Sequence, residues 1–189
     1  MELSNSLKEA VEQLRQAELD ASNGLPQKLF LLVSALVPLP NVDLLIVNAQ
    51  KQILLSRRND GFFQKSWHIP GGCMRYGETF ENRIQETARH ELGSFVHFET
   101  EPIAVRNVIR GINPRQEHPM ERGHNVAILF RCTLPDDYKI DNHGLDESDN
   151  GYLKWFDTLP DDFMQIQNVY ADILTPWMKI EEDNHGYLE

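Results

Sequence analysis

Residues Trp67 to Gly93 read WHIPGGCMRYGETFENRIQETARHELG, and the rest of the fold can be inferred outward from this segment. It opens with an extended apolar segment, passes through Gly71 and Gly72, and then enters a helix. At the two glycines, the missing Cβ lets backbone carbonyls approach a ligand. One side of the helix is apolar, with residues recurring every four positions at Phe80, Ile84, Ala88 and Leu92. Because Gly93 stands where a helix often ends, the sequence predicts a strand, a glycine loop and a helix in succession.

A second face of this helix carries polar side chains. Thr87, His90 and Glu91 lie three and four positions apart and therefore share one side of the helix. A glycine loop followed by a helix with oxygen ligands suits a hydrated magnesium ion that holds a diphosphate. Magnesium prefers a few protein oxygens together with substrate phosphates to a full protein cage.

The same stretch resembles the Nudix box, G-x5-E-x7-R-E-U-x-E-E-x-G-U, in which U is an aliphatic residue. Gly72, Glu78, Glu91 and Gly93 fall on fixed positions of the box, and Ala88 falls on an aliphatic one. The preceding W-x-x-P-G-G segment makes the match more specific. The resemblance implies an α/β fold of the Nudix type, an α/β/α sandwich with a mixed sheet.

The box departs from the family pattern at three positions. Glu86 stands in place of the Arg, Thr87 in place of the first Glu, and His90 in place of the first residue of the Glu pair. Of the acidic face that usually binds the metals, only Glu91 is kept. The departures argue against a site for several magnesium ions, since each ion needs compensating carboxylates.

Apolar runs predict the sheet. The segments Val42–Val47 and Val126–Phe130 read as central strands, because they are apolar nearly throughout. Further strands are expected around 52–57, 96–98, 103–108 and 152–157. Residues 109–123 predict a long polar loop, which in a compact domain is often functional. A final helix is expected over 168–179, perturbed at Pro176.

The N-terminal segment reads as a separate element. We expect a helical arm over residues 1–37 and the Nudix domain over residues 38–189. A first helix within residues 1–24 would start with a capping box formed by Ser6 and Glu9. Its narrow apolar stripe consists of Leu7, Val11 and Leu14. The stripe could pack on its own domain or form a contact in a homodimer, and the second alternative is the one we favour.

Composition restricts the partners. The formal net charge of −11 excludes broad binding to the phosphate backbone of nucleic acid, which needs a basic surface. The two cysteines, Cys73 and Cys132, read as buried or free thiols, as in a reducing compartment. The polar N-terminus is not typical of a signal peptide, and the longest apolar run is too short to span a bilayer. A cytoplasmic protein without a membrane partner is expected.

Cationic side chains surround the glycine loop. Arg57, Arg58 and Lys65 precede it, and Arg75 lies inside it. A charge run is usually a solvated face, but in an acidic protein these four form a plausible surface for a diphosphate. Arg binds phosphate oxygens through a planar fork, so we assign Arg58 to the leaving phosphate and Arg57 to its support.

Two further residues are candidates for contacts in the site. Asp43 interrupts an apolar strand. It is either an edge carboxylate bonded to nearby backbone or a buried one that must be paired or placed near a cation. His124 begins a central strand at the end of the long loop. It is either structural or a substrate contact.

Within the Nudix superfamily, the altered box most resembles that of the GDP-mannose mannosyl hydrolases, over roughly residues 38–157. The likeness extends to Asp43, to Arg57 and Arg58, and to Trp67. It implies cleavage of a C–O bond at the sugar carbon, which releases GDP. It also implies one magnesium ion, or manganese in its place, held by Glu91, the Gly72 carbonyl and Asp149.

The resemblance fails at the catalytic base. Asn150 stands where that family has its catalytic His, and an amide cannot act as a general base near neutral pH. Asp149, Glu147 or His143 could take the proton instead. Three functions follow: hydrolysis of a nucleotide sugar at carbon, hydrolysis of a nucleoside diphosphate derivative at phosphorus, or binding of a nucleotide without catalysis. The enzyme reading is favoured because Glu78, Glu91 and the arginines are kept.

Overall fold

The computed structural model describes residues 2–61, 63–110 and 122–178 of the chain. Within these ranges the strands form two sheets, one of five strands and one of three. Most of the long polar loop expected over 109–123 lies outside the described residues. No helix in the described ranges is both long enough and apolar enough to cross a membrane.

The larger sheet is mixed, as predicted. Its centre is the parallel pair β1 (Leu39–Ile46) and β7 (His124–Thr133). The edge strand β4 (Gly71–Cys73) pairs antiparallel with β1. Two further strands, β5 (His97–Phe98) and β6 (Ala104–Ile109), pair antiparallel with β7. Both segments predicted as central strands are confirmed.

The smaller sheet is antiparallel. Its middle strand β2 (Ile53–Arg58) lies between β3 (Ser66–His68) and β8 (Leu153–Phe156). The antiparallel pairing of β2 with β3 sets Arg57 opposite Trp67 and Arg58 opposite Ser66, on the segment that leads into the glycine loop. This sheet therefore carries the two arginines that the sequence assigns to phosphate.

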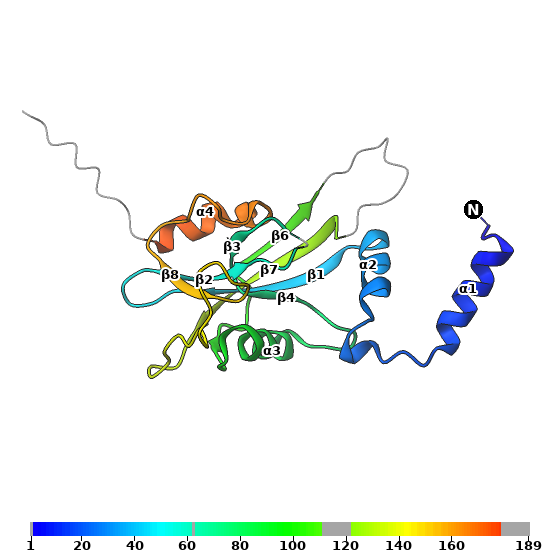
Figure 1. Ribbon diagram of the computed structural model, residues 1–189, viewed down its shortest axis with the longest axis horizontal. Helices are drawn as coiled ribbons and strands as arrows, with labels where there is room; N and C mark the ends of the chain where they lie inside the picture. Colours follow the sequence, from blue (N-terminus) through cyan, green and yellow to red (C-terminus); the bar gives the residue numbers. More distant parts are fainter. Residues whose placement is uncertain (1, 62, 111–121, 179–189) are drawn as a thin grey trace, which may run out of the picture.

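The box helix α3 (Phe80–Leu92) forms one outer layer. Thr79 accepts a hydrogen bond from the Asn82 N–H at its start, and Gly93 adopts the left-handed conformation at its end. Figure 1 shows α3 on one side of the strands and α4 with its flanking segments on the other. Helices thus cover both faces of the strands, and the expected sandwich of helices around strands is confirmed.

Strand β1 shows how the sequence separates the two cores. Val42, Leu44 and Ile46 point to the core beneath α3. Leu45 points to the opposite core, which contains Tyr170. Successive side chains of a strand alternate between faces, so Asp43 lies on the face of Leu45. This alternation places a carboxylate in an otherwise apolar layer.

The C-terminal segment differs from the expected helix over 168–179. It consists of the 3-10 turns η2 (Gln165–Tyr170) and η3 (Thr175–Trp177), with the four-residue helix α4 (Ala171–Leu174) between them. Pro176 lies in η3, where its missing N–H prevents a further α-helical bond. A continuous α-helix was therefore the wrong expectation, although the break at the proline was right.

The N-terminal arm is more broken than its pattern suggested. Helix α1 (Asn5–Gln16) is capped by the Ser4 hydroxyl, which accepts from the Leu7 N–H, so the capping box at Ser6 is wrong. A 3-10 turn, η1 (Ala21–Asn23), follows before helix α2 (Gln27–Leu36).

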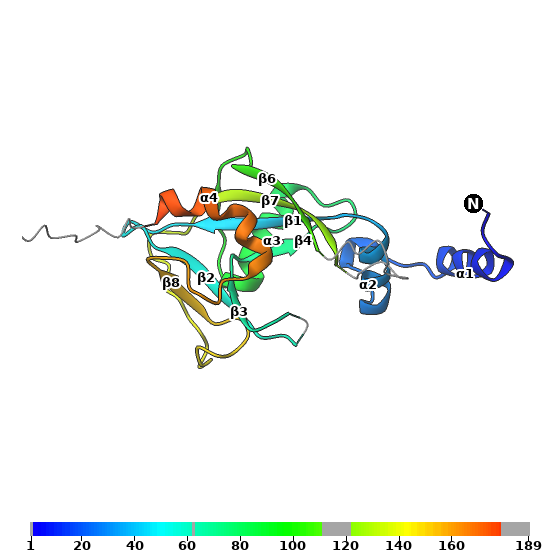
Figure 2. The ribbon, with the colours of Figure 1, turned by 90° about the horizontal axis from the view of Figure 1, so that it is seen from above.

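The apolar stripe of α1 is exposed. None of the residues of α1 is buried, and Figures 1 and 2 both show it set apart from the sheets. The structure therefore does not support packing of the stripe on its own domain. The homodimer and the domain boundary at residue 38 stay predictions.

Candidate functional site

A cavity of about 850 Å³ opens between the two sheets. Its walls come from β1, β2, β4, the C-terminal end of α3 and the segment between β7 and β8. Five of the residues predicted for the site line this cavity: Asp43, Arg57, Arg58, Gly72 and Glu91. Segments far apart in the sequence thus converge on one space.

Glu91 is held against the glycine loop. The Gly71 N–H donates a hydrogen bond of 3.1 Å to its Oε1 atom. Burial raises the pKa of Glu91 to about 7, while this hydrogen bond and the charge of Arg58 act in the opposite direction. A carboxylate in such a position is stabilised by a bound cation.

Asp43 is the second carboxylate of the site, and it is buried. It accepts hydrogen bonds from Asn41 Nδ2 (2.9 Å), Gln167 Nε2 (3.2 Å) and the Tyr170 hydroxyl (2.9 Å). Burial nonetheless raises its pKa to about 7. Of the two interpretations above, the edge carboxylate bonded to backbone is wrong, because β1 is a central strand and all three partners are side chains.

Gly71 separates the two carboxylates. Its N–H faces Glu91, and a Cβ on its Cα would overlap the Oδ1 atom of Asp43. Only glycine fits between them without displacing one carboxylate. The first glycine of the loop is therefore required for close approach.

The register of β4 distinguishes the carbonyls of the two glycines. The Leu44 N–H donates to the Pro70 carbonyl, and bonded and non-bonded pairs alternate along antiparallel strands. Gly72 therefore belongs to a bonded pair and turns its carbonyl toward β1. The Gly71 carbonyl points away from β1, to the same side as the Gly71 N–H that donates to Glu91. Gly72 stays a prediction as a ligand, and the register favours Gly71 in that role.

The donors near Glu91 fit a hard cation. Besides Glu91 and Asp43, the Thr87 Oγ1 atom is buried without a hydrogen-bond partner among the described residues. All three are oxygen donors, which suit magnesium better than softer metals. The described residues contain no group of three or more His, Cys, Asp or Glu side chains arranged around a metal. The arrangement fits one ion that takes its other ligands from phosphate and water.

Glu78 and Arg83 hold the glycine loop in shape. Arg83 donates from its NH1 group to the Cys73 carbonyl (3.1 Å) and pairs with Glu78 across 3.7 Å. The Glu78 Oε2 atom accepts from the Arg75 N–H (2.8 Å). The match of Glu78 to the box is thus explained by a structural role in the turn before α3.

The two arginines of β2 have different partners. Arg57 forms an ion pair with Asp162 and stacks on Trp67, 4.7 Å from the ring centroid. Arg58 pairs with Asp60 at 2.7 Å and stacks on Phe63. Each partner fixes a long side chain at the wall of the cavity, so both guanidinium groups are positioned before a ligand binds.

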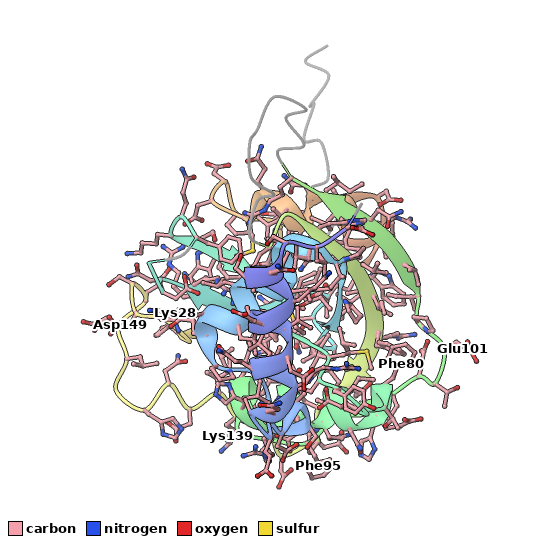
Figure 3. All side chains as sticks on the ribbon, turned by 90° about the vertical axis from the view of Figure 1, so that its right-hand side faces the viewer. Lys28, Phe80, Phe95, Glu101, Lys139 and Asp149 are labelled. Carbon is pink, nitrogen blue, oxygen red and sulfur yellow. The ribbon has the colours of Figure 1, made fainter. Side chains whose placement is uncertain are left out.

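Four predicted residues do not line the cavity. Lys65 and Arg75 are exposed on its outside. His124 pairs with Ile109 at the start of β7. Asp149 accepts from the Asp146 N–H (2.8 Å) and lies at the periphery of the molecule in Figure 3. Their assigned roles stay predictions without support from this geometry.

Of the three candidate bases in the segment between β7 and β8, the structure places His143 at the cavity. Asn150 uses its Oδ1 atom to accept from the Asn59 N–H (2.9 Å), which is a structural contact. Both Asp141 and His143 line the cavity, and their Oδ2 and Nδ1 atoms are 3.1 Å apart. The other oxygen of Asp141 accepts from the His143 N–H (2.8 Å). The ring is therefore oriented with its Nε2 atom available.

Several residues of the site could not be predicted from any sequence pattern. Gln167 and Tyr170 reach Asp43 from a segment more than 120 positions away. Arg110 and Arg122 line the cavity from the two sides of the polar loop. Their placement depends on the pairing of β6 with β7, which no local pattern specifies.

The sequence profile of the NUDIX domain matches residues 37–166, more than half of the chain. The chain belongs to the NUDIX domain family. A search of curated proteins gave no match. Family membership makes the protein a hydrolase, as the sequence predicted, and hydrolases of this family generally use divalent metals, typically magnesium.

Solved structures show the same fold. A UDP-X diphosphatase is 22% identical, with 91% of this chain and 78% of that chain covered and a TM-score of 0.54. A MutT NUDIX hydrolase from Burkholderia pseudomallei is 20% identical, covering 72% and 97%, with a TM-score of 0.52. A possible asymmetric diadenosine tetraphosphate hydrolase from Jonesia denitrificans is 17% identical, covering 77% and 99%, with a TM-score of 0.53.

Proposed function

We propose that this NUDIX hydrolase acts on a nucleoside diphosphate joined to another moiety, a nucleotide sugar such as GDP-mannose, and cleaves it at the sugar carbon. The observation that carries the proposal is the convergence of Glu91, Asp43 and Arg58 on one cavity. Two carboxylates can hold a cation, and an arginine can bind phosphate oxygens beside it. A diphosphate requires both.

Different groups of the protein would bind the cation and the phosphates. Glu91, the Gly71 carbonyl and Thr87 offer oxygen ligands, and Asp43 adds negative charge behind them. Magnesium, or manganese in its place, would neutralise the charge that develops on the departing diphosphate. Arg58 would bind the leaving phosphate through its remaining donors, with Arg57 behind it as support.

His143 is the proposed general base, with Asp141 as the group that orients it. In the neutral imidazole, an Nδ1–H donated to Asp141 leaves Nε2 as the acceptor. The adjacent Asn142 anchors this segment to β8 through two hydrogen bonds to Leu153. His143 is thereby kept at the cavity, where Asn150 cannot perform proton transfer.

The proposed reaction breaks the bond between the sugar carbon and the diphosphate oxygen. Water forms the new C–O bond and gives its proton to His143 Nε2. The electron pair of the broken bond stays on the diphosphate, which leaves as a nucleoside diphosphate. The sugar carbon retains the water oxygen as its hydroxyl.

Attack at phosphorus is the alternative. The same cation site and Arg58 would serve it, and the UDP-X diphosphatase with the same fold supplies a reason to include UDP-sugars among the substrates tested. In that case the water oxygen ends on a phosphate, and the sugar leaves as a sugar phosphate.

Hydrolysis in 18O-labelled water tests the choice of bond. The proposal expects the label in the released sugar and expects His143→Gln to lower kcat by about a hundredfold, the usual contribution of a general base. Label in a phosphate product would overturn cleavage at carbon. Label in the sugar with His143→Gln fully active would remove His143 from the reaction.

The arm is proposed to join two copies of the chain. The side chains of Leu7, Val11 and Leu14 are 41–47% exposed and form one stripe, which a second copy could bury. Sedimentation of the full chain should show a dimer, and replacing the three residues with Gln should give a monomer. A wild-type monomer at high concentration would contradict the dimer. The free cysteines Cys73 and Cys132 accord with the proposed cytoplasmic location.

A further inference from the structure

Three arginines surround one aromatic ring at the wall of the cavity. The guanidinium carbons of Arg58, Arg110 and Arg122 lie 4.5, 4.9 and 5.0 Å from the centroid of Phe63. All four residues line the cavity. In a chain with a formal net charge of −11, this arginine cluster (Arg58, Arg110 and Arg122) is a local concentration of positive charge.

The cluster is assembled from separate elements. Arg58 ends β2, Arg110 follows β6, and Arg122 precedes β7. Arg110 is fixed by two bonds to the neighbouring strand, its N–H to the Gly123 carbonyl (2.7 Å) and its NH2 group to the Arg122 carbonyl (3.4 Å). The backbone of each arginine is thus held by the fold.

Helix α2 positions Arg122. The Arg122 N–H donates to the hydroxyl of Ser34, which is buried (2.9 Å). Its guanidinium carbon lies 5.7 Å from the ring centroid of Phe30 on the same helix. The second helix of the arm therefore helps to position a residue that lines the cavity.

The cluster adjoins the glycine loop. The charge of Arg122 and a hydrogen bond from it act to lower the pKa of the Cys73 thiol, against the larger effect of burial, which raises it. Cys73 directly follows Gly72. An anion held by Arg122 would therefore lie beside the phosphates that bind at the loop.

Bringing these positively charged guanidinium groups together costs free energy on folding. Burial lowers the pKa of Arg122, and the charges of Arg58 and Arg110 lower it further, while Asp60 and Cys73 act in the opposite direction. Burial also lowers the pKa of Arg110. Stacking on Phe63 needs at most one or two arginines. A purely structural role therefore does not explain why a third arginine lies at the same ring.

We propose that Arg58, Arg110 and Arg122 form a subsite for a second anionic group of the substrate, beyond the diphosphate. The proposal deepens the proposed function and rests on it, because Arg58 is shared between the two groups. Each guanidinium has five N–H donors, so pairing with Asp60 leaves donors on Arg58 for an anion.

Two kinds of substrate carry such a group. One is a nucleoside diphosphate sugar acid, in which a carboxylate is attached to the sugar. The other is a nucleotide with one more phosphate. A planar carboxylate and a phosphate are both recognised by the forked donors of Arg, so the shared chemistry is an oxyanion.

Calorimetric binding to the full chain with magnesium tests the subsite. The first arm compares UDP-glucuronate with UDP-glucose, which differ by the carboxylate. The second compares UTP with UDP, which differ by a phosphate. Glu91→Gln is included to confirm that binding depends on the cation site. We expect the more anionic ligand of at least one pair to bind at least about tenfold more tightly, as for a charge-assisted hydrogen bond.

Two variants assign the preference to the cluster. Arg110→Gln and Arg122→Gln should each lower that preference by about tenfold, and Arg106→Gln should leave it at the wild-type value. Arg106 is a matched control because it lies on β6 outside the cavity and pairs with Asp172 at the surface. Thermal unfolding of each variant checks that it folds. If Arg122→Gln does not fold, the affinities of Arg110→Gln alone test whether the cluster causes the preference.

The outcomes separate the subsite from the proposed function. A preference that disappears in the variants, with no hydrolysis of either UDP-sugar or of GDP-mannose, would support the subsite and contradict the proposed function. Hydrolysis with equal affinity for both members of each pair would overturn the subsite and leave the proposed function standing. Failure of all four ligands to bind, or a preference unchanged by both variants, would also overturn the subsite.

Discussion

The two walls of the cavity are built differently. One wall, the carboxylate wall, consists of Glu91, Gly71 and Asp43 and lies along β1, β4 and the end of α3. The other wall is the arginine cluster around Phe63. On the first wall, burial raises the pKa of both carboxylates to about 7, and on the second it lowers the pKa of two arginines. Each wall would be stabilised by a ligand of opposite charge.

The difference explains what each wall can bind. One buried and one half-buried carboxylate favour a cation, and three guanidinium groups favour an anion. A magnesium complex of a nucleoside diphosphate carries both charges and can bridge the walls.

Gly71→Ala should damage the carboxylate wall most. A Cβ at this position would overlap Asp43 Oδ1, so one carboxylate must move. We expect the free energy of unfolding to fall by about 3 kcal/mol, the upper end of the usual cost of overpacking. Denaturant unfolding measures this, and activity should fall with it.

Gly72→Ala is the matched control for that substitution. Its Cβ would stand 3.1 Å from Thr87 Oγ1, a hydroxyl at the end of a side chain, so the strain is smaller. We expect a loss below about 1 kcal/mol. Equal losses in the two variants would show that Gly71 has no special place between the carboxylates.

The carboxylate wall was largely predictable, whereas the arginine cluster was not. Gly72, Glu78 and Glu91 lie within a single contiguous stretch, where spacing alone defines a helix face and a turn. For the lone Asp43 in an apolar strand, a buried, paired carboxylate was one of the two interpretations that the sequence left open. Local patterns therefore sufficed for this half of the site.

The rest depends on tertiary structure. Arg110 and Arg122 meet because β6 and β7 pair antiparallel, which brings the residue after β6 close to the residues that precede β7. Tyr170 reaches Asp43 because the C-terminal segment packs on the second core. In the last loop, the sequence left the proton acceptor open among Asp149, Glu147 and His143, and the structure places His143 at the cavity beside Asp141. Loop residues cannot be aligned with a motif when no periodicity fixes them.

Arg58→Ala should remove one cation from the arginine cluster and leave the fold unchanged. Its charge-assisted hydrogen bonds to phosphate would be lost, so binding of a nucleoside diphosphate should weaken by about ten- to a hundredfold. Calorimetry measures the affinity, and Arg131→Ala, which removes a surface pair with Glu99, serves as control. An unchanged affinity in Arg58→Ala would place the diphosphate elsewhere.

A smaller effect, on the pH dependence of stability, is expected at His68, which also lines the cavity. Burial, followed by the charge of Arg58, lowers its pKa to about 4, so the folded state keeps it neutral while the unfolded chain protonates near pH 6.5. Its contribution to stability is therefore complete above pH 6.5 and is lost as the pH falls toward 4.

We expect His68→Gln to reduce the loss of unfolding free energy between pH 7 and 5.5 by about 1 kcal/mol relative to wild type. Denaturant unfolding at each pH measures it. His97→Gln, at an exposed position, should retain the wild-type slope. If the slope of His68→Gln matches that of the wild type, His68 is not held neutral by its surroundings.

The most direct test of the two-wall account is the affinity for a cation in the absence of any substrate. Mn²⁺ titration followed by electron paramagnetic resonance should show binding to wild-type protein and at least about tenfold weaker binding to Glu91→Gln. Glu86→Gln, on the same helix but paired with Arg89 at the surface, should bind as wild type does. Unaltered Mn²⁺ affinity in a folded Glu91→Gln variant would contradict the assignment of the carboxylate wall to the metal.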